Sequence, residues 1–167
     1  QEILSTNSGN GGEDLITLLN GQNTVVGGAN SDRAIMGDGR NTVLGDEGWL
    51  RVLPADGTTE IQSLNPSVGS VDDIDLGAGY NIAIGGQDSD EIDVAGGSAD
   101  SRGVVIGDNG RLLLDASGVL SFIESTDYTY GATDYINLVD GTNAVVAGVG
   151  DDEITAGSGQ NTVIADD

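Results

Sequence analysis

One stretch of the sequence reads Gly85-Gly86-Gln87-Asp88-Ser89-Asp90-Glu91-Ile92. Small residues precede an aspartate in it, and an aliphatic residue stands two positions after that aspartate. Glycine lets the backbone bend until its carbonyl oxygens converge, the aspartate adds a charged oxygen, and the aliphatic residue anchors the turn. Converging carbonyl and carboxylate oxygens suit a hard cation, above all Ca²⁺. Three further stretches have the same form, at residues 9–16, 27–34 and 147–154.

A nine-residue frame extends from these turns through the chain. With Gly9 at the first position, the sixth position holds Asp14, Asn23, Asp32 and Asn41, and the eighth holds Ile16, Val25, Ala34 and Val43. The pattern returns 58 residues on and again 62 residues later, since Asp14 recurs as Asp72 and Asp134. Such self-similarity indicates stacked repeats, in which each coil buries its aliphatic side chain against its neighbours.

We therefore predict an all-β fold, a parallel β-roll or β-solenoid of stacked nonapeptide half-turns. Residues 1–167 would form a single array, with repeat copies at approximately 9–66, 67–128 and 129–167 and the last copy incomplete. Two nonapeptides make one 18-residue turn, so odd frames stack on one edge and even frames on the other.

The two edges differ chemically. The odd one, the Asp edge, carries Asp14, Asp32, Asp72, Asp90, Asp134 and Asp152, and the even one, the Asn edge, carries Asn23, Asn41, Asn81, Asn143 and Asn161. Stacked carboxylates repel unless a cation lies between them, whereas stacked Asn side chains can form a neutral hydrogen-bonded ladder. We predict cations on the Asp edge only. Tolerance of left-handed turn conformations is the alternative explanation of both columns.

Two matched segments of 22 residues, 45–66 and 107–128, lie between the copies. Kept in frame, they put Val52, Ile61, Leu114 and Ile123 at the aliphatic position, which favours one additional, wider turn of the coil. A projecting β-hairpin is the alternative, because Pro54-Ala55-Asp56-Gly57 and Ala116-Ser117-Gly118 are good turn sequences. In either case Asp46, Asp108 and Asp166 are expected to close a further site above Asp32, Asp90 and Asp152.

The amino-acid composition limits the kinds of functional site and partner that the chain can have. The chain has 28 Asp and Glu against 5 Arg, a net charge of −23, so we expect it to repel nucleic acid and anionic lipid. Without Cys or His, thiolate metals, zinc sites and His-based catalysis are excluded. With 28 Gly and 4 % aromatic residues, only thin aliphatic layers can form a core. No apolar run is long enough to cross a bilayer, so no membrane insertion is expected.

These turns resemble the glycine- and aspartate-rich nonapeptides of RTX (repeats-in-toxin) proteins, as found in large extracellular bacterial adhesins. The resemblance implies a parallel β-roll that binds calcium between stacked turns, outside Gram-negative bacteria, after secretion in an unfolded state. In that family the aspartate bridges two ions and carbonyls of small residues complete the shell. Two turns, 67–72 and 129–134, depart from the pattern by keeping one glycine each, and the Asn edge lacks the family's carboxylate.

Carried over by position, the resemblance implies about six Ca²⁺ ions along the Asp edge. The residues that it implicates are Gly9, Gly11, Asp14, Gly27, Ala29, Asp32, Asp46, Asp72, Gly85, Gln87, Asp90, Asp108, Asp134, Ala147, Val149, Asp152 and Asp166.

The favoured function is a calcium-stabilised structural module of a long extracellular adhesin, stalk or filament, joined to neighbouring repeats or to copies of itself end to end. A flat surface for ice or polysaccharide is the alternative, because Thr24, Thr42 and Thr162 hint at a rank of threonines. Ile82 and Val104 interrupt that rank. Paired carboxylates can also act on sugars, but here they recur with the period as scaffold residues do, so no enzyme is expected.

Overall fold

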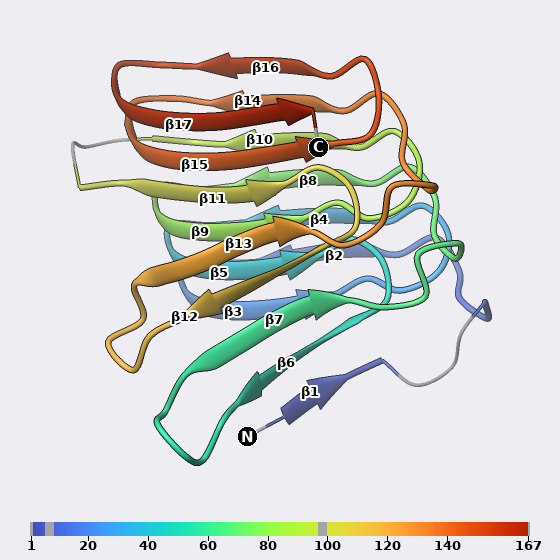
Figure 1. Cartoon of the computed structure of the whole chain (residues 1–167), viewed down its shortest axis with the longest axis horizontal. Helices are drawn as coiled ribbons and strands as arrows, with labels where there is room; N and C mark the ends of the chain where they lie inside the picture. Colours follow the sequence, from blue (N-terminus) through green and yellow to red (C-terminus); the bar gives the residue numbers. More distant parts are fainter. Residues whose placement is uncertain (1, 6–8, 97–99, 167) are drawn as a thin grey trace.

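The structure is a computed structural model that describes residues 2–5, 9–96 and 100–166, with the side chain of Asp166 left out. It is all-β: the described residues form strands and no helix, and most strand pairs are parallel. Two six-stranded parallel sheets face each other, and a five-stranded antiparallel sheet lies against the outer side of one of them (Figure 1).

The chain alternates between the two parallel sheets. The first sheet contains β2 (Leu15–Leu18), β4 (Arg33–Met36), β8 (Asp73–Leu76), β10 (Glu91–Val94), β14 (Tyr135–Leu138) and β16 (Glu153–Ala156). The second sheet contains β3 (Gly21–Val26), β5 (Gly39–Leu44), β9 (Gly79–Ile84), β11 (Arg102–Ile106), β15 (Gly141–Gly148) and β17 (Gly159–Asp166). Each strand pairs in register with its equivalent in the next coil, as Leu15 does with Arg33.

The main core lies between these two sheets. Val25, Ala34 and Val43 from the eighth position of the frame are buried there with their counterparts in the later copies, and Ile16 packs against them. The predicted aliphatic position is thus confirmed. Because successive strand residues point to opposite faces, one aliphatic residue at a fixed frame position is enough to fill the layer.

The 22-residue segments form hairpins, so the favoured prediction of a wider coil turn is wrong, and the alternative holds for the reversal of the chain but not for its projection. β6 (Gly48–Val52) pairs antiparallel with β7 (Thr59–Ser63), and β12 (Gly110–Leu114) pairs antiparallel with β13 (Leu120–Ser125). The turn sequences at residues 53–58 and 115–119 reverse the chain, which a frame count alone does not reveal.

These hairpins do not project into solvent. They pair with each other through β7 and β12, and β1 (Glu2–Leu4) pairs with β6, which completes a sheet that we call the hairpin layer. Its apolar face covers the second sheet: Ile61 and Leu112 are buried against Leu44, Ile84 and Ile106. Of the four in-frame aliphatic residues, Ile61 and Leu114 are buried, Ile123 is half-buried and Val52 is exposed.

A buried carboxylate joins the two hairpins. Glu60 on β7 accepts hydrogen bonds from Arg51 on β6 at 3.0 Å and from Arg111 on β12 at 2.5 Å. Burial raises the pKa of Glu60, but the two arginines outweigh this effect and hold its pKa below the ordinary value. Ion pairs as well as backbone hydrogen bonds therefore join the hairpins of successive copies.

Candidate metal centre

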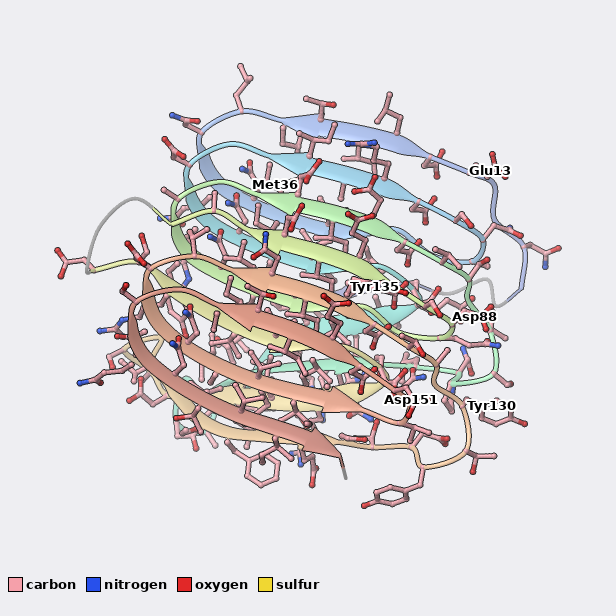
Figure 2. All side chains as sticks on the ribbon, turned by 90° about the horizontal axis from the view of Figure 1, so that it is seen from above. Glu13, Met36, Asp88, Tyr130, Tyr135 and Asp151 are labelled. Carbon is pink, nitrogen blue, oxygen red and sulfur yellow. The ribbon has the colours of Figure 1, made fainter. Side chains whose placement is uncertain are left out.

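The Asp edge is a stack of turns that lead into the strands of the first sheet, alternately from the hairpin layer and from the second sheet. Figure 2 shows Glu13, Asp88, Tyr130 and Asp151, which belong to these turns, along one side of the molecule. In the turns at 27–34 and 85–92 the fourth residue has positive φ, 75° at Asn30 and 67° at Asp88, which Asn, Asp and Gly tolerate best. Most other residues would be strained in this backbone conformation, so the residue types at this position suit the turn.

Each aspartate of the edge is tied to the next by its backbone. The N–H of Asp14 donates to Oδ1 of Asp32 at 2.8 Å, and the N–H of Asp32 donates to Oδ1 of Asp72 at 2.7 Å. The series continues from Asp72 to Asp90, from Asp90 to Asp134 and from Asp134 to Asp152. The carboxylates therefore stack in one column and do not diverge into solvent.

The second carboxylate oxygen of the inner aspartates has a different environment. Among the described residues, Oδ2 has no hydrogen-bond partner and is buried in Asp32, Asp72, Asp90 and Asp134. Burying an ionised oxygen without a partner is costly, so such a group either takes up a proton or binds a cation. This row of four oxygens is the most unusual chemical feature of the described chain.

Glycines leave room beside each of these oxygens. A Cβ on Gly85 would overlap both Oδ2 of Asp90 and the carbonyl oxygen of Gly107. The same holds for Gly27 with Asp32 and Gly45, for Gly45 with Asp72 and Gly85, and for Gly107 with Asp134 and Ala147. A small space bounded by a carboxylate oxygen and a carbonyl oxygen therefore repeats four times along the edge.

Burial raises the pKa of these carboxyl groups. The pKa of Asp72 rises to about 7 and that of Asp134 to about 8, in both cases chiefly by desolvation. For Asp90 the pKa is raised well above 3.8 by desolvation and by the neighbouring charges of Asp134 and Asp72. The pKa of Asp32 is raised by desolvation as well. The column therefore accumulates negative charge only at a cost, which a divalent cation would offset.

The arrangement fits calcium by donor chemistry. Ca²⁺ takes six to eight oxygen ligands, including carboxylates, backbone carbonyls and water. Here each space offers one carboxylate oxygen and one carbonyl oxygen, and within the described residues no group of three or more Asp or Glu side chains converges on a single point. An ion at this edge would depend on the stacking of turns and not on a cluster of acidic side chains within one turn.

Asp46 and Asp108 lie at equivalent places in successive copies. Both oxygens of Asp46 accept backbone N–H groups, from Ser70 at 3.3 Å and from Gln87 at 2.5 Å. These donors lie in the turns at 67–72 and 85–90 of the second copy. Asp46 was predicted above Asp32 of its own copy, and its carboxylate instead binds the backbone of the second copy. Desolvation raises its pKa to about 8.

The carboxylate of Asp108 repeats this arrangement one copy further on. It accepts N–H groups from Ala132 at 3.2 Å and from Val149 at 2.5 Å. Desolvation raises its pKa to about 7. Gly148, with φ 117°, packs so closely that a Cβ there would overlap the carboxylate. Both aspartates therefore act first as acceptors that join two turns.

The structure places the remaining predicted residues in varied settings. Gly11 packs tightly against buried Ala29, whereas Asp14 is exposed at the end of the stack. Oε1 of Gln87 is buried without a hydrogen-bond partner among the described residues, which makes it a further candidate oxygen at the turn before Asp90. The side chain of Asp166 lies outside the described part of the chain.

Sequence reasoning missed three residues at this edge. Gly45 and Gly107 place carbonyl oxygens beside the aspartate column. Gly45 stands at the first position of an odd frame, as Gly27 does, so the frame itself carried the signal. Glu47 is buried and accepts the N–H of Gly9 at 3.2 Å. It lies in the hairpin segment, outside the repeat, and no sequence pattern pointed to it.

The Asn edge forms the predicted neutral ladder in two runs, Asn23 to Asn81 and Asn143 to Asn161, with Gly103 between them. Nδ2 of Asn23 donates to Oδ1 of Asn41 at 2.8 Å, and Asn41 donates in turn to Asn81 at 2.9 Å. Each amide also donates to a carbonyl four residues earlier, as Asn41 does to Gly37. Because amide groups carry both donors and acceptors, this column is satisfied without an ion.

In comparisons with protein families, curated proteins and solved structures, no match to this chain was found. A search of the described residues for a helix that could span a bilayer also found none.

Proposed function

We propose that this chain is a calcium-stabilised β-roll of RTX type, a structural module of a long extracellular bacterial adhesin, stalk or filament. The observation that carries the proposal is the row of buried Oδ2 atoms beside glycine carbonyls, which repeats at Asp32, Asp72, Asp90 and Asp134. Ca²⁺ bound there would neutralise the charge of the column and join consecutive coils. No catalytic role is proposed.

The free energy of calcium binding is large enough to control folding. At a calcium concentration ten times Kd, each ion adds about 1.4 kcal/mol to the free energy of unfolding, and four ions add about 6 kcal/mol. That sum is comparable with the whole stability of a typical domain, about 5–15 kcal/mol. Extracellular calcium modules have Kd values of about 10⁻⁴ to 10⁻³ M, so such a chain would fold outside the cell and stay unfolded in the cytosol.

Circular dichroism at pH 8 tests the proposal, with Ca²⁺ and Mg²⁺ titrated separately into chelator-treated chain. We expect a β-sheet spectrum to develop with calcium, and magnesium to be much less effective because it keeps its water shell and demands a small octahedral site. A spectrum that is unchanged by calcium would refute calcium-dependent folding, and equal responses to both ions would refute the calcium site.

An ice- or polysaccharide-binding face is not advanced. The threonine rank lies on the side of the second sheet that faces the hairpin layer, and Thr42 is buried there. Thr24 and Thr162 are exposed, but the buried Thr42 means that the threonines do not form a continuous flat surface for an extended ligand.

A further inference from the structure

We infer that two molecules of this chain associate back to back through the outer face of the hairpin layer, the side that is turned away from the second sheet. The contact goes beyond the proposed function, because it is lateral and does not use the Asp edge. Alternate residues of β6, β7, β12 and β13 form this face, since the residues between them point inward against the second sheet. Its members are Trp49, Arg51, Glu60, Gln62, Arg111, Leu113, Phe122 and Glu124.

This face does not depend on the open edges of the parallel sheets. Its four strands belong to two hairpins that lie outside the coils (Figure 1). Further coils and hairpins at either end would extend the layer sideways, as β1 extends it beside β6, and would leave the face uncovered. The contact is therefore open both to a single module and to an array of them.

The outer face is neutral, in contrast to the chain as a whole. It carries two arginines against two glutamates, whereas the net charge of the chain is −23. On the opposite side of the molecule, the outer face of the first sheet presents the carboxylates of Asp73, Asp75, Glu91 and Asp93 against the one guanidinium of Arg33. Two copies can therefore approach through the hairpin layer without the repulsion that the first sheet would impose.

The single Trp and the single Phe of the chain both belong to this face. The guanidinium of Arg51 lies 3.8 Å from the ring centre of Trp49, and that of Arg111 lies 5.8 Å from the ring centre of Phe122. Phe122 is 40 % exposed. Aromatic residues and arginine are enriched where proteins contact one another. The composition of the face therefore favours a protein partner.

The order of the charges identifies that partner as a second copy. Along the strand order β6-β7-β12-β13 the outward charges alternate in sign, from Arg51, Glu60, Arg111 and Glu124. A two-fold axis parallel to the strands, between β7 and β12, places β6 over β13 of the second copy and β7 over its β12. Each strand then faces a strand of opposite charge. Such a contact is isologous and closes as a dimer.

The charges at the two sides of the face have groups left for this contact. Nε and Nη2 of Arg51 donate to Glu60, and its Nη1 makes no hydrogen bond within the described part of the chain. Glu124 contacts Arg111 through Oε1 at 3.5 Å, and its Oε2 has no partner among the same residues. The side chains of Arg51 and Glu124 are 44 % and 42 % exposed. In the two-fold arrangement Arg51 of each copy faces Glu124 of the other.

Sedimentation velocity on the full chain in calcium, over a range of protein concentrations, tests the inference by charge reversal. Arg51→Glu and Glu124→Arg each place like charges against one another, so each variant alone should dimerise on the order of tenfold more weakly than the parent chain. An equimolar mixture of the two should form heterodimers with the affinity of the parent, because each reversed charge then meets its opposite. Arg33→Glu is the matched control on the first sheet and should dimerise as the parent does.

Phe122→Glu gives a further variant of the face that leaves its ion pairs in place, and it should also be monomeric. Circular dichroism on every sample shows which variants keep the β-sheet spectrum. Among folded variants, dimers of Arg51→Glu, Glu124→Arg or Phe122→Glu with the parent's affinity, a mixture that stays monomeric, or an equal loss in Arg33→Glu would overturn the inference.

The parent chain separates this inference from the proposed function. A β-sheet spectrum with a monomeric mass at every concentration would overturn the dimer and leave calcium-dependent folding intact. A parent chain without a β-sheet spectrum in calcium would overturn the proposed function, and the dimer with it, because the hairpin layer would not form.

Discussion

The peptide N–H of Asp72 donates to Oδ1 of Asp90 at 2.8 Å, while Oδ2 of the same Asp90 carboxylate is buried with no hydrogen-bond partner among the described residues. One oxygen thus joins neighbouring turns, and the other is left for a proton or a cation. The stability of the stack should therefore depend on what occupies that second position, and several measurements can separate the possibilities.

Without calcium, the chain should lose stability as the pH rises. The folded-state pKa values of Asp72 and Asp134 are about 7 and about 8, above the ordinary value of 3.8, so the folded state binds more protons than the unfolded state between these limits. The stabilisation is complete below about pH 4 and is lost as the pH passes through 7 to 8. Circular dichroism in chelator at pH 5 and pH 8 compares the folded fractions, and a larger folded fraction at pH 8 would contradict the prediction.

Calcium affinity should change with pH in the opposite sense. The ion requires ionised carboxylates, so its binding displaces protons from the Asp edge and strengthens as the pH rises from 6 to 8. Isothermal titration calorimetry in two buffers of different ionisation enthalpy would detect the released protons. Binding with no proton release at pH 7 would show that these aspartates are not the ligands.

The substitution Asp90→Asn should have opposite effects with and without calcium. In chelator it removes a buried charge, so the β-sheet signal of the variant should persist to a higher pH than that of the parent chain. In calcium at ten times Kd the variant should lose about 1.4 kcal/mol for each ion that Asp90 holds. Circular dichroism against pH in chelator and thermal unfolding in calcium are the measurements. A change of the same sign in both would mean that Asp90 is only a scaffold residue.

Filling one of the glycine spaces should be costly. Gly85→Ala places a Cβ against Asp90 and the carbonyl of Gly107, so we expect a loss of about 1–3 kcal/mol and a weaker calcium response. Gly12→Ala is the matched control, because a Cβ there meets no atom within 4 Å. Equal urea midpoints for the two variants would argue against a confined space.

The Asn edge should contribute without any ion. Asn81→Leu would remove the acceptor of one of the two N–H groups of Asn41 Nδ2, the other staying bonded to Gly37, and would remove the side-chain donor to the carbonyl of Gly77. Each buried unsatisfied group costs about 1–3 kcal/mol. We expect the same loss in calcium at pH 8 and in chelator at pH 5. A loss confined to the calcium sample would indicate an ion at this edge too.

Much of this arrangement follows from local repetition. Asp32 and Asn41 were assigned to opposite edges by frame position alone, and the structure stacks Asp32 on Asp72 and Asn41 on Asn81. A side chain at a fixed place in every coil must meet its equivalents above and below. The sequence left the hairpin as an alternative to the favoured wider coil, because a length of 22 residues suits either, and only the pairing of β6 with β7 distinguishes them.

The sequence by itself determined which residues stack, because a period of nine residues, two to a coil, fixes the register within a copy, and the return of the pattern after 58 and then 62 residues aligns the copies. Tertiary structure decided how each carboxylate is used. In the folded chain Oδ1 of Asp90 accepts a backbone N–H, and Oδ2 is buried beside Gly107. Ile61 pairs with Leu112 of another copy. Burial and pairing between residues tens of positions apart depend on the assembled layers, and no local pattern encodes them.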